Sequence, residues 1–297
     1  MDLQRPRPMT RVHSSSAQAR FTYRGHPFVV EAPGEEEHIL KSIKKKGCFY
    51  ELPLLEYVFY LRKEILRRGA MSLDVGANIG NHSIYFARFL CTRVLSVEPN
   101  PSVTPFLESN LEANSANCLV LSLALGNKRG RGHIRLPEIA TNNIGMAQIE
   151  STGAEEAGIR IETLDGLLPE LRQSQQIGDE RVALLKVDVE GMELSVLEGA
   201  RGILKSDKPE LLLEAASMDK QLELVQFLGP LGYEVMSKSG ATPMLHFSHQ
   251  PSARMRRAVR IARLRSKISR LARSSKRRWT ALLGGQSEPI HSGYENE

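Results

Sequence analysis

The chain has 297 residues, of which 41% are hydrophobic and 25% charged, a composition typical of a globular protein that buries a sizeable core. No apolar run approaches the roughly 18 residues of a membrane-spanning helix, and the N-terminus lacks the apolar segment of a signal peptide. The three cysteines, Cys48, Cys91 and Cys118, have no paired spacing. We therefore expect no disulfide framework, no tight metal site and a cytoplasmic location.

The net charge of +6 combines two unlike parts. Residues 254–278 contain twelve Lys and Arg residues and no Asp or Glu, so this segment alone carries +12. The remainder of the chain therefore has a net charge of −6. This distribution predicts an acidic body with a basic C-terminal extension rather than a uniformly basic protein.

The first 70 residues are predicted to precede the main domain. Residues 1–18 are mostly polar and are expected to form a disordered leader. Residues 19–70 are expected to pack on the core as a β-hairpin around Gly25 and a helix over 52–68, where apolar residues recur at helical spacing.

Residues 71–248 are predicted to form one nucleotide-binding α/β domain, because short apolar runs alternate with helical segments. Strands this apolar indicate a mostly parallel sheet covered by helices on both faces. The less regular segment 126–176 is expected to hold a hairpin over 128–136, a polar loop with Asn142 and Asn143, and a strand and helix around 159–171. The predicted strands are 72–75, 93–97, 119–123, 182–187, 210–213, 233–236 and 244–247, and the predicted helices are 80–89, 102–114, 193–205 and 219–231.

The sharpest local motif is LDVGANIGN, which begins at Leu73. A strand runs into a glycine-bearing turn and a helix follows at once, so the backbone can approach a ligand closely and N–H groups at the helix start can meet a polar group. The second strand ends in the motif VEPN, which places the Glu98 carboxylate where it can accept hydrogen bonds from a ribose diol. Together these motifs predict a nucleoside-containing ligand.

The glycine turn departs from the dinucleotide-binding fingerprint. Its spacing is G-A-N-I-G rather than G-x-G-x-x-G, and Asp74 stands two residues before the first glycine. A carboxylate at that position would repel a pyrophosphate but would suit a cationic amino-acid moiety. This difference favours S-adenosylmethionine over NAD as the ligand. His82 and Ser83, in the first turn of the next helix, are weaker candidates for cofactor contact.

A third motif, LLKVDVEGMELSVLEGA, includes Lys186, Asp188 and Glu190 at the carboxyl end of a strand, where open α/β sheets bind their ligands. Asp188 is the first candidate for positioning an acceptor hydroxyl or taking its proton, and Glu190 is the second. Glu193 lies in the first turn of the following helix, where a carboxylate is also expected for purely structural reasons.

The runs DVGANIGNHSIYFA, VEPNP, LALGNKRG and the Asp188 motif resemble the FkbM family of methyltransferases, and residues 47–51 (GCFYE) resemble a segment that this family carries upstream. The resemblance covers about residues 49–236. It implies a Rossmann-like class I methyltransferase fold with a seven-stranded sheet whose last strand is antiparallel. By this resemblance the S-adenosylmethionine site consists of Asp74, Gly76, Ala77, Asn78, Gly80, Glu98, Pro99, Asn100, Ala124 and Leu125.

The resemblance further implies O-methylation of a small-molecule or glycan hydroxyl, on a sugar, glycolipid or polyketide-type acceptor. Two other classes remain open from the residues alone. One is an NAD(P)-dependent oxidoreductase, which the glycine spacing and Asp74 disfavour. The other is a non-catalytic adaptor that binds the cofactor and acts through its basic tail.

The tail, residues 249–297, is predicted to be partly helical or disordered. Ile261, Leu264, Ile268 and Leu271 recur at helical spacing within the basic segment 254–278. Such a helix suits an anionic membrane surface, which would make the protein peripheral at the inner membrane surface. A polyanion such as nucleic acid is the less favoured partner. Docking of the stripe on the acidic body and an extension with no specific partner are the remaining alternatives.

Overall fold

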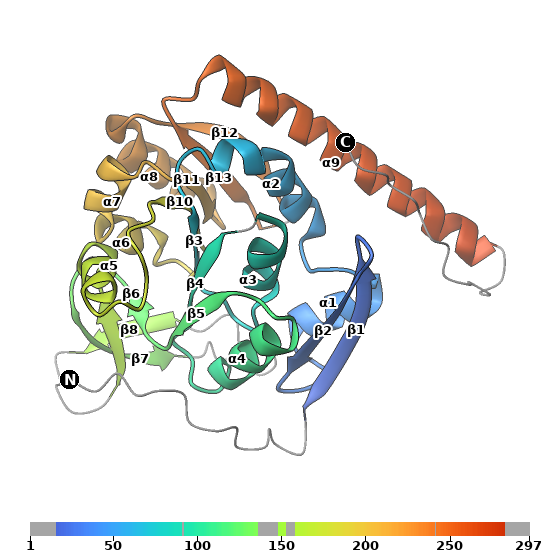
Figure 1. The fold of residues 1–297 in the computed structure, drawn as a ribbon, viewed down its shortest axis with the longest axis horizontal. Helices are drawn as coiled ribbons and strands as arrows, with labels where there is room; N and C mark the ends of the chain where they lie inside the picture. The colour runs from blue at the N-terminus through green and yellow to red at the C-terminus, as the bar shows by residue number, and fades with distance from the viewer. Residues whose placement is uncertain (1–15, 91, 136–147, 153–157, 241, 283–297) are drawn as a thin grey trace.

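The computed structural model describes residues 16–90, 92–135, 148–152, 158–240 and 242–282. Its centre is a seven-stranded sheet with the strand order β12-β13-β11-β10-β3-β4-β5 (Figure 1). Only β13 runs antiparallel to its neighbours, so the predicted mostly parallel sheet with an antiparallel last strand is confirmed. The strands are β3 (Met71–Val75), β4 (Arg93–Val97), β5 (Cys118–Leu121), β10 (Val182–Val187), β11 (Glu210–Glu214), β12 (Tyr233–Ser239) and β13 (Met244–His249).

Helices cover both faces of the sheet, and most of its strands contribute alternate side chains to two separate apolar clusters. One cluster contains side chains from α2 (Leu52–Ile65), α3 (Asn81–Tyr85), the π-helical turn Phe86–Leu90 and α4 (Thr104–Ala113). The other contains side chains from α5 (Leu164–Gln173), α6 (Glu193–Glu198), α7 (Arg201–Ser206) and α8 (Met218–Leu228). The single helix predicted over 193–205 is divided in the structure into α6 and α7, which are separated by Gly199 and Ala200.

The predicted N-terminal hairpin is present as β1 (Ala17–Tyr23) and β2 (His26–Ala32), which turn at Arg24 and Gly25 with positive φ angles. Strand β1 begins at Ala17, inside the segment expected to be a disordered leader. A helix that the sequence analysis did not predict, α1 (His38–Lys46), follows β2.

Asn110 of α4 and Asn114, which caps the end of that helix, bind the backbone of β2. The Asn110 side chain accepts from the Glu31 N–H at 2.7 Å and donates to the Glu31 carbonyl at 2.8 Å. Asn114 makes the same pair of bonds with Val29, at 3.1 and 2.6 Å. Each amide therefore imitates the backbone of a neighbouring strand, which joins the hairpin to the main domain and satisfies β2 groups that would otherwise lack partners.

A second sheet of four short strands lies beside the main one, with the order β6-β9-β7-β8. The hairpin expected over 128–136 is wrong: the segment is the single strand β7, which pairs with β8 and β9. The strand and helix expected around 159–171 are present as β9 and α5. Asn142 and Asn143 lie outside the described residues. The strands are β6 (Ala124–Leu125), β7 (Gly130–Arg135), β8 (Gln148–Thr152) and β9 (Ile159–Glu162).

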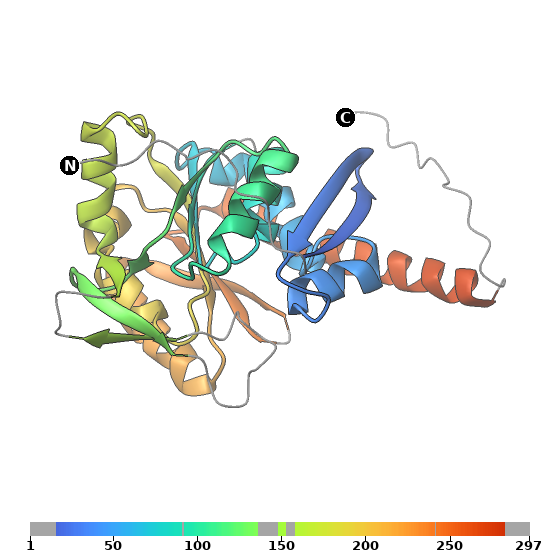
Figure 2. The same ribbon diagram turned by 90° about the horizontal axis from the view of Figure 1, so that it is seen from below.

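The C-terminal extension forms one long helix, α9 (Ala253–Leu282), which packs across α2 and then projects past the body (Figure 2). Within the described ranges, no helix combines the length and apolar character needed to cross a membrane.

Candidate cofactor and acceptor site

A cavity of about 470 Å³ opens at the carboxyl ends of β3, β4, β10 and β11, where an open α/β sheet is expected to bind its ligand. Most of the predicted site residues line it, from both the glycine turn and the Asp188 motif. Among the described residues no group of three or more His, Cys, Asp or Glu side chains could hold a metal ion. The predicted residues that line the cavity are Gly76, Ala77, Asn78, Glu98, Pro99, Asn100, Ala124, Leu125, Asp188 and Glu190.

Asp74 and Gly80 are the two predicted site residues that do not line the cavity. The Asp74 carboxylate is fully buried, 3.0 Å from the Lys186 ammonium, and it accepts a 2.6 Å hydrogen bond from Ser83. The expectation that Asp74 faces a cationic ligand therefore needs correction. Its charge is matched inside the protein by Lys186, which leaves Asp74 with a structural role beneath the glycine turn.

The glycine turn is shaped by contacts within the protein. Gly76 has a φ of +77°, and a Cβ atom there would lie 1.8 Å from the Asp188 carbonyl oxygen. Gly80 has a φ of +90°, and its Cβ would lie 2.9 Å from the Leu107 side chain on α4. These positions require glycine because the turn after β3 packs closely against the end of β10 and against α4.

The N–H groups of the turn are also occupied within the protein. Those of Gly76 and Ala77 donate to the Val97 carbonyl at 3.0 and 3.1 Å, and that of Asn78 donates to the Glu98 carboxylate at 2.9 Å. These three N–H groups precede α3, which begins at Asn81, so they are not the helix-start groups expected to meet a ligand.

Glu98 is held rigidly at the end of β4. One carboxylate oxygen accepts from the Asn78 N–H and the other from the Asn100 N–H, both at 2.9 Å. Burial raises the pKa of Glu98, and the two N–H donors oppose that shift. Each oxygen keeps a further acceptor position, so this carboxylate is fixed in place with capacity to accept two more hydrogen bonds.

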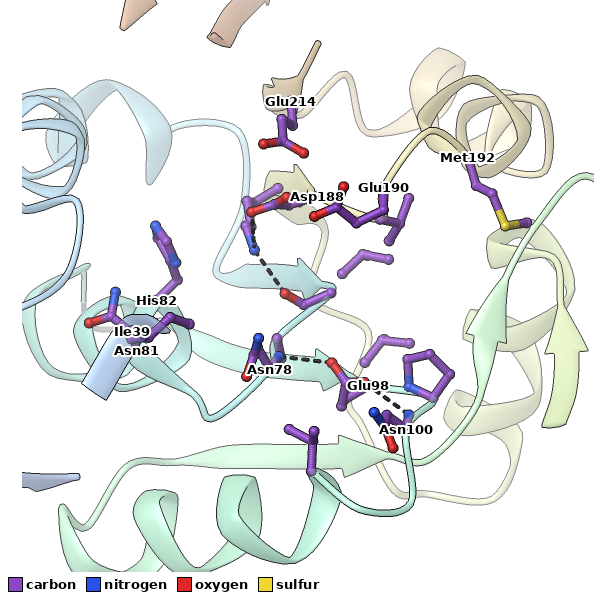
Figure 3. A pocket seen from close by; sticks show the side chains of 18 of the residues that line it. Ile39, Asn78, Asn81, His82, Glu98, Asn100, Asp188, Glu190, Met192 and Glu214 are labelled. Atoms are coloured by element: carbon purple, nitrogen blue, oxygen red, sulfur yellow. Dashed lines mark hydrogen bonds and ion pairs between the residues drawn. The ribbon is translucent and has the colours of Figure 1, made fainter. Parts of the chain in front are cut away.

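Three carboxyl groups gather on another side of the cavity, namely Asp188, Glu190 and Glu214 (Figure 3). Asp188 lies 3.4 Å from the Lys186 ammonium, and its side chain is 28% exposed. Burial favours its neutral form, but the charge of Lys186 and a hydrogen bond with Glu214 outweigh burial and lower the pKa of Asp188. Asp188 is therefore ionised at neutral pH.

Glu214 is a site residue that the sequence analysis missed. It ends β11 beside Asp188, because Leu213 pairs with Val187 in the parallel register of β10 and β11. Burial and the negative charge of Asp188 raise the pKa of Glu214 to about 9. At neutral pH the pair therefore holds one proton and one negative charge. The sequence did hold one signal for Glu214. This residue comes directly after the predicted strand 210–213, and the carboxyl edge of such a sheet binds ligands.

Glu190 and Glu193 differ in role. Glu190 lines the cavity with a φ of +51°, a conformation that is uncommon for a residue other than glycine. Glu193 is buried and accepts from the Gly191 N–H at 3.0 Å, so it supports the turn into α6. The structural interpretation of Glu193 therefore fits its contacts.

The segment before α2 completes the cavity wall. Tyr50 and Glu51 line the cavity together with His82, whose ring nitrogen Nε2 lies 3.4 Å from the Glu51 carboxylate. Asn81 anchors the segment by accepting from the Tyr50 N–H at 2.9 Å and donating to the Tyr50 carbonyl at 3.1 Å. Ser83 is directed to Asp74, so of the two weaker candidates only His82 reaches the cavity.

We expect Glu214→Gln to change how stability depends on pH. Because folding raises the Glu214 pKa, the folded state binds more protons than the unfolded state between about pH 4.5 and about pH 9. Wild type should lose this part of its stability as the pH rises through that window, and the glutamine variant should not. Melting curves at successive pH values measure the difference.

The gap in melting temperature between Glu214→Gln and wild type should widen with rising pH and level off above about pH 9. Glu108→Gln is the control, because Glu108 is exposed on α4, outside the cavity. A gap for Glu214→Gln that is independent of pH would contradict the assigned pKa.

The sheet order, the single antiparallel strand and the cavity position define a class I methyltransferase fold. A family model described as the methyltransferase FkbM domain matches residues 74–235, more than half of the chain. The chain therefore belongs to the FkbM methyltransferase family.

Two curated relatives are similar to part of the chain. Hexuronic acid methyltransferase AglP of Haloferax volcanii is 32% identical over 184 residues, which cover 61% of this chain and 71% of AglP. Methyltransferase sdnD of Sordaria araneosa is 30% identical over 154 residues, 43% of this chain and 59% of sdnD. The chain thus matches less than two thirds of sdnD. A crystal structure of an FkbM methyltransferase from Methylobacillus flagellatus aligns with 65% of this chain and 47% of that one, at 21% identity and a TM-score of 0.45.

Proposed function

We propose that this protein is an S-adenosylmethionine-dependent methyltransferase that acts on a hydroxyl oxygen of a sugar, glycolipid or polyketide-type acceptor. The observation that carries the proposal is that one cavity combines two features. One is the fixed carboxylate of Glu98, which can accept hydrogen bonds from a ribose, and the other is the acidic group of Asp188, Glu190 and Glu214. A sulfonium cation is favoured beside carboxylates, whereas a dinucleotide phosphate is repelled by them.

The side chains fit the parts of this cofactor. Glu98 has acceptor capacity left for the two ribose hydroxyls. Val103, Leu123 and Leu125 add apolar groups to the cavity wall, which suit a purine ring. The carboxylates suit the cationic amino-acid and sulfonium groups. When bound, S-adenosylmethionine supplies an electrophilic methyl group and is converted to the neutral thioether.

The acidic pair is suited to activate an acceptor hydroxyl. Lys186 keeps Asp188 ionised and oriented, so its carboxylate can accept a hydrogen bond from the hydroxyl. As the new carbon–oxygen bond forms, the hydroxyl proton passes to Asp188, while Glu214 donates a hydrogen bond to the same carboxylate. Binding donor and acceptor in one cavity supplies much of the remaining acceleration, since methyl transfer is an in-line displacement.

Support for the acceptor class comes from the polar cavity wall and from one relative. Tyr50, His82 and Thr242 offer hydrogen-bonding groups near the acidic group, which suits a hydroxyl-rich acceptor. AglP is named a hexuronic acid methyltransferase. Assays with a radiolabelled methyl donor over sugar, glycolipid, polyketide and amine acceptors test the class, and label found only in the amine acceptors would refute it.

Calorimetric titration separates the alternatives. We expect binding of S-adenosylmethionine and S-adenosylhomocysteine and none of NAD. Binding of NAD alone would instead indicate the oxidoreductase. Binding of both methyltransferase ligands, without turnover of any acceptor class, would indicate the non-catalytic adaptor.

We expect Glu98→Gln to weaken binding of S-adenosylmethionine by about 10- to 100-fold, because a hydrogen bond to a charged group contributes roughly 1.5–3 kcal/mol. Calorimetry with adenosine should show a similar loss, since both ligands share the ribose. Glu108→Gln is the matched control. Unchanged affinity in a folded Glu98→Gln variant would show that Glu98 does not hold the ribose.

A further inference from the structure

Helix α9 has two different long faces. Met255, Val259 and Ala262 are buried against the body, mainly on α2. Farther along the same face, Ser266 donates to the Pro53 carbonyl at 2.7 Å and Ser269 donates to Glu56 at 3.0 Å. This face is the contact between the extension and the domain, and it holds the helix in a fixed orientation.

The predicted apolar stripe of α9 lies on the other side of the helix. Ile261, Leu264, Ile268 and Leu271 are 43%, 59%, 55% and 56% exposed. At 100° per residue they occupy the side roughly opposite the contact face. The alternative in which this stripe docks on the acidic body is therefore wrong, because other residues make that contact. Four large aliphatic side chains in one exposed row are an unusual surface for a soluble helix.

The body neutralises only part of the charge on α9. Arg254 pairs with Glu64 at 2.6 Å, Arg256 with Glu234 at 2.8 Å and Arg273 with Glu56 at 2.7 Å. The remaining cations before residue 273 are exposed, and one of them, Arg265, lies over the Tyr60 ring. Among the described residues no acidic side chain lies in ion-pair range of Arg257, Arg260, Arg263, Lys267 or Arg270.

We propose that the exposed face of α9 docks this protein on an anionic phospholipid surface. The aliphatic row would enter the boundary between headgroups and acyl chains, and the free cations beside it, such as Arg260 and Lys267, would meet lipid phosphates. Because the contact face already holds α9 against the body as a folded helix, docking needs no folding step. This inference is independent of the proposed methyl transfer.

Charge and apolar character together select this partner. A polyanion such as RNA would contact the cations but leave the aliphatic row in water. A second copy of α9 would cover the row but bring two sets of unpaired cations together, which is unfavourable. A bilayer surface with anionic headgroups satisfies both parts of the face.

Sedimentation with vesicles tests the proposal on the full-length chain. Wild type should bind vesicles of phosphatidylcholine mixed with phosphatidylglycerol and bind phosphatidylcholine alone at least about tenfold more weakly. Leu264→Glu combined with Ile268→Glu should reduce binding about tenfold or more, because it removes the inserted groups. Both residues are exposed, so the melting temperature should stay unchanged.

The matched controls make the same kinds of substitution on helices other than α9. Leu222→Glu alters a similarly exposed leucine, 56% exposed on α8, and should bind as wild type does. Arg260→Glu with Lys267→Glu should weaken binding to anionic vesicles. Lys45→Glu with Lys205→Glu makes the same charge change on α1 and α7 and should have a much smaller effect.

Three results would overturn the proposal. One is equal binding to neutral and anionic vesicles, or binding to neither. Another is loss of binding in the charge-reversed pair together with full binding in Leu264→Glu/Ile268→Glu, which would indicate a polyanion site. The third is a wild-type dimer in light scattering that becomes a monomer in the Leu264→Glu/Ile268→Glu variant, which would assign the row to a second copy.

Discussion

Asp188→Asn is expected to lower kcat by about 10²–10⁴ while leaving the affinity for S-adenosylmethionine within roughly tenfold of wild type. The asparagine keeps the shape of the side chain but cannot take the hydroxyl proton. Asp188 faces the cavity and is kept ionised by Lys186, so its loss should affect turnover more than cofactor binding. Single-turnover rates with a saturating acceptor, together with calorimetric affinities, measure the two effects separately.

Glu190→Gln is the comparison for this experiment, because Glu190 lines the same side of the cavity. We expect its loss of kcat to be much smaller. A larger loss in Glu190→Gln than in Asp188→Asn would reassign the proton acceptor to Glu190. Full activity of Asp188→Asn on the true acceptor would show that neither proton transfer nor acceptor positioning depends on this carboxylate.

Lys186→Met is expected to lower the free energy of unfolding by about 3–5 kcal/mol, because it leaves a buried carboxylate without its cation. Lys186 is 2% exposed, and its ammonium lies 3.0 Å from Asp74, 3.0 Å from the Gly76 carbonyl and 3.4 Å from Asp188. Burial alone would lower the pKa of Lys186, but the charges of Asp74 and Asp188 outweigh it and raise that pKa. The methionine side chain preserves the length of the stem and removes only these polar contacts. Denaturant titration measures the change.

A double variant tests the cause of this loss. Adding Asp74→Asn to Lys186→Met removes the unpaired buried charge, so it should restore part of the lost stability. Lys205→Met, at an exposed position of α7, is the control for loss of a lysine and should change stability little. A cost for Lys186→Met below about 1 kcal/mol, or no recovery in the double variant, would contradict the account of the buried pair.

The main strands and helices were predictable because their signals are local. Apolar runs such as 182–187 predict buried strands wherever the chain places them, and the glycine turn after β3 needs only its own residues to indicate a strand-to-helix junction. Local signals are insufficient where a strand pairs with distant segments, as the hairpin wrongly expected over 128–136 shows. The segment contains Gly130 and Gly132, but its partners β8 and β9 lie later in the chain, and pairing with them makes it one strand.

The same limit applies to the direction of charged side chains. Asp74 lies within an apolar strand and Glu98 follows one, and both were expected to face a ligand. Glu98 does line the cavity, whereas Asp74 is directed inward because Lys186, on the neighbouring strand β10, supplies a buried cation. Glu214 became a site residue only through the register that sets it beside Asp188.

The sequence by itself determined the family, the strands of the main sheet and the residue types available at their carboxyl ends, since the signals for these lie within short stretches of the chain. The tertiary structure alone decided which carboxylates face the cavity, which one is paired inside, and which face of α9 stays exposed. These outcomes depend on partners that are distant in the chain, because burial and charge pairing arise only when separate strands and helices pack together.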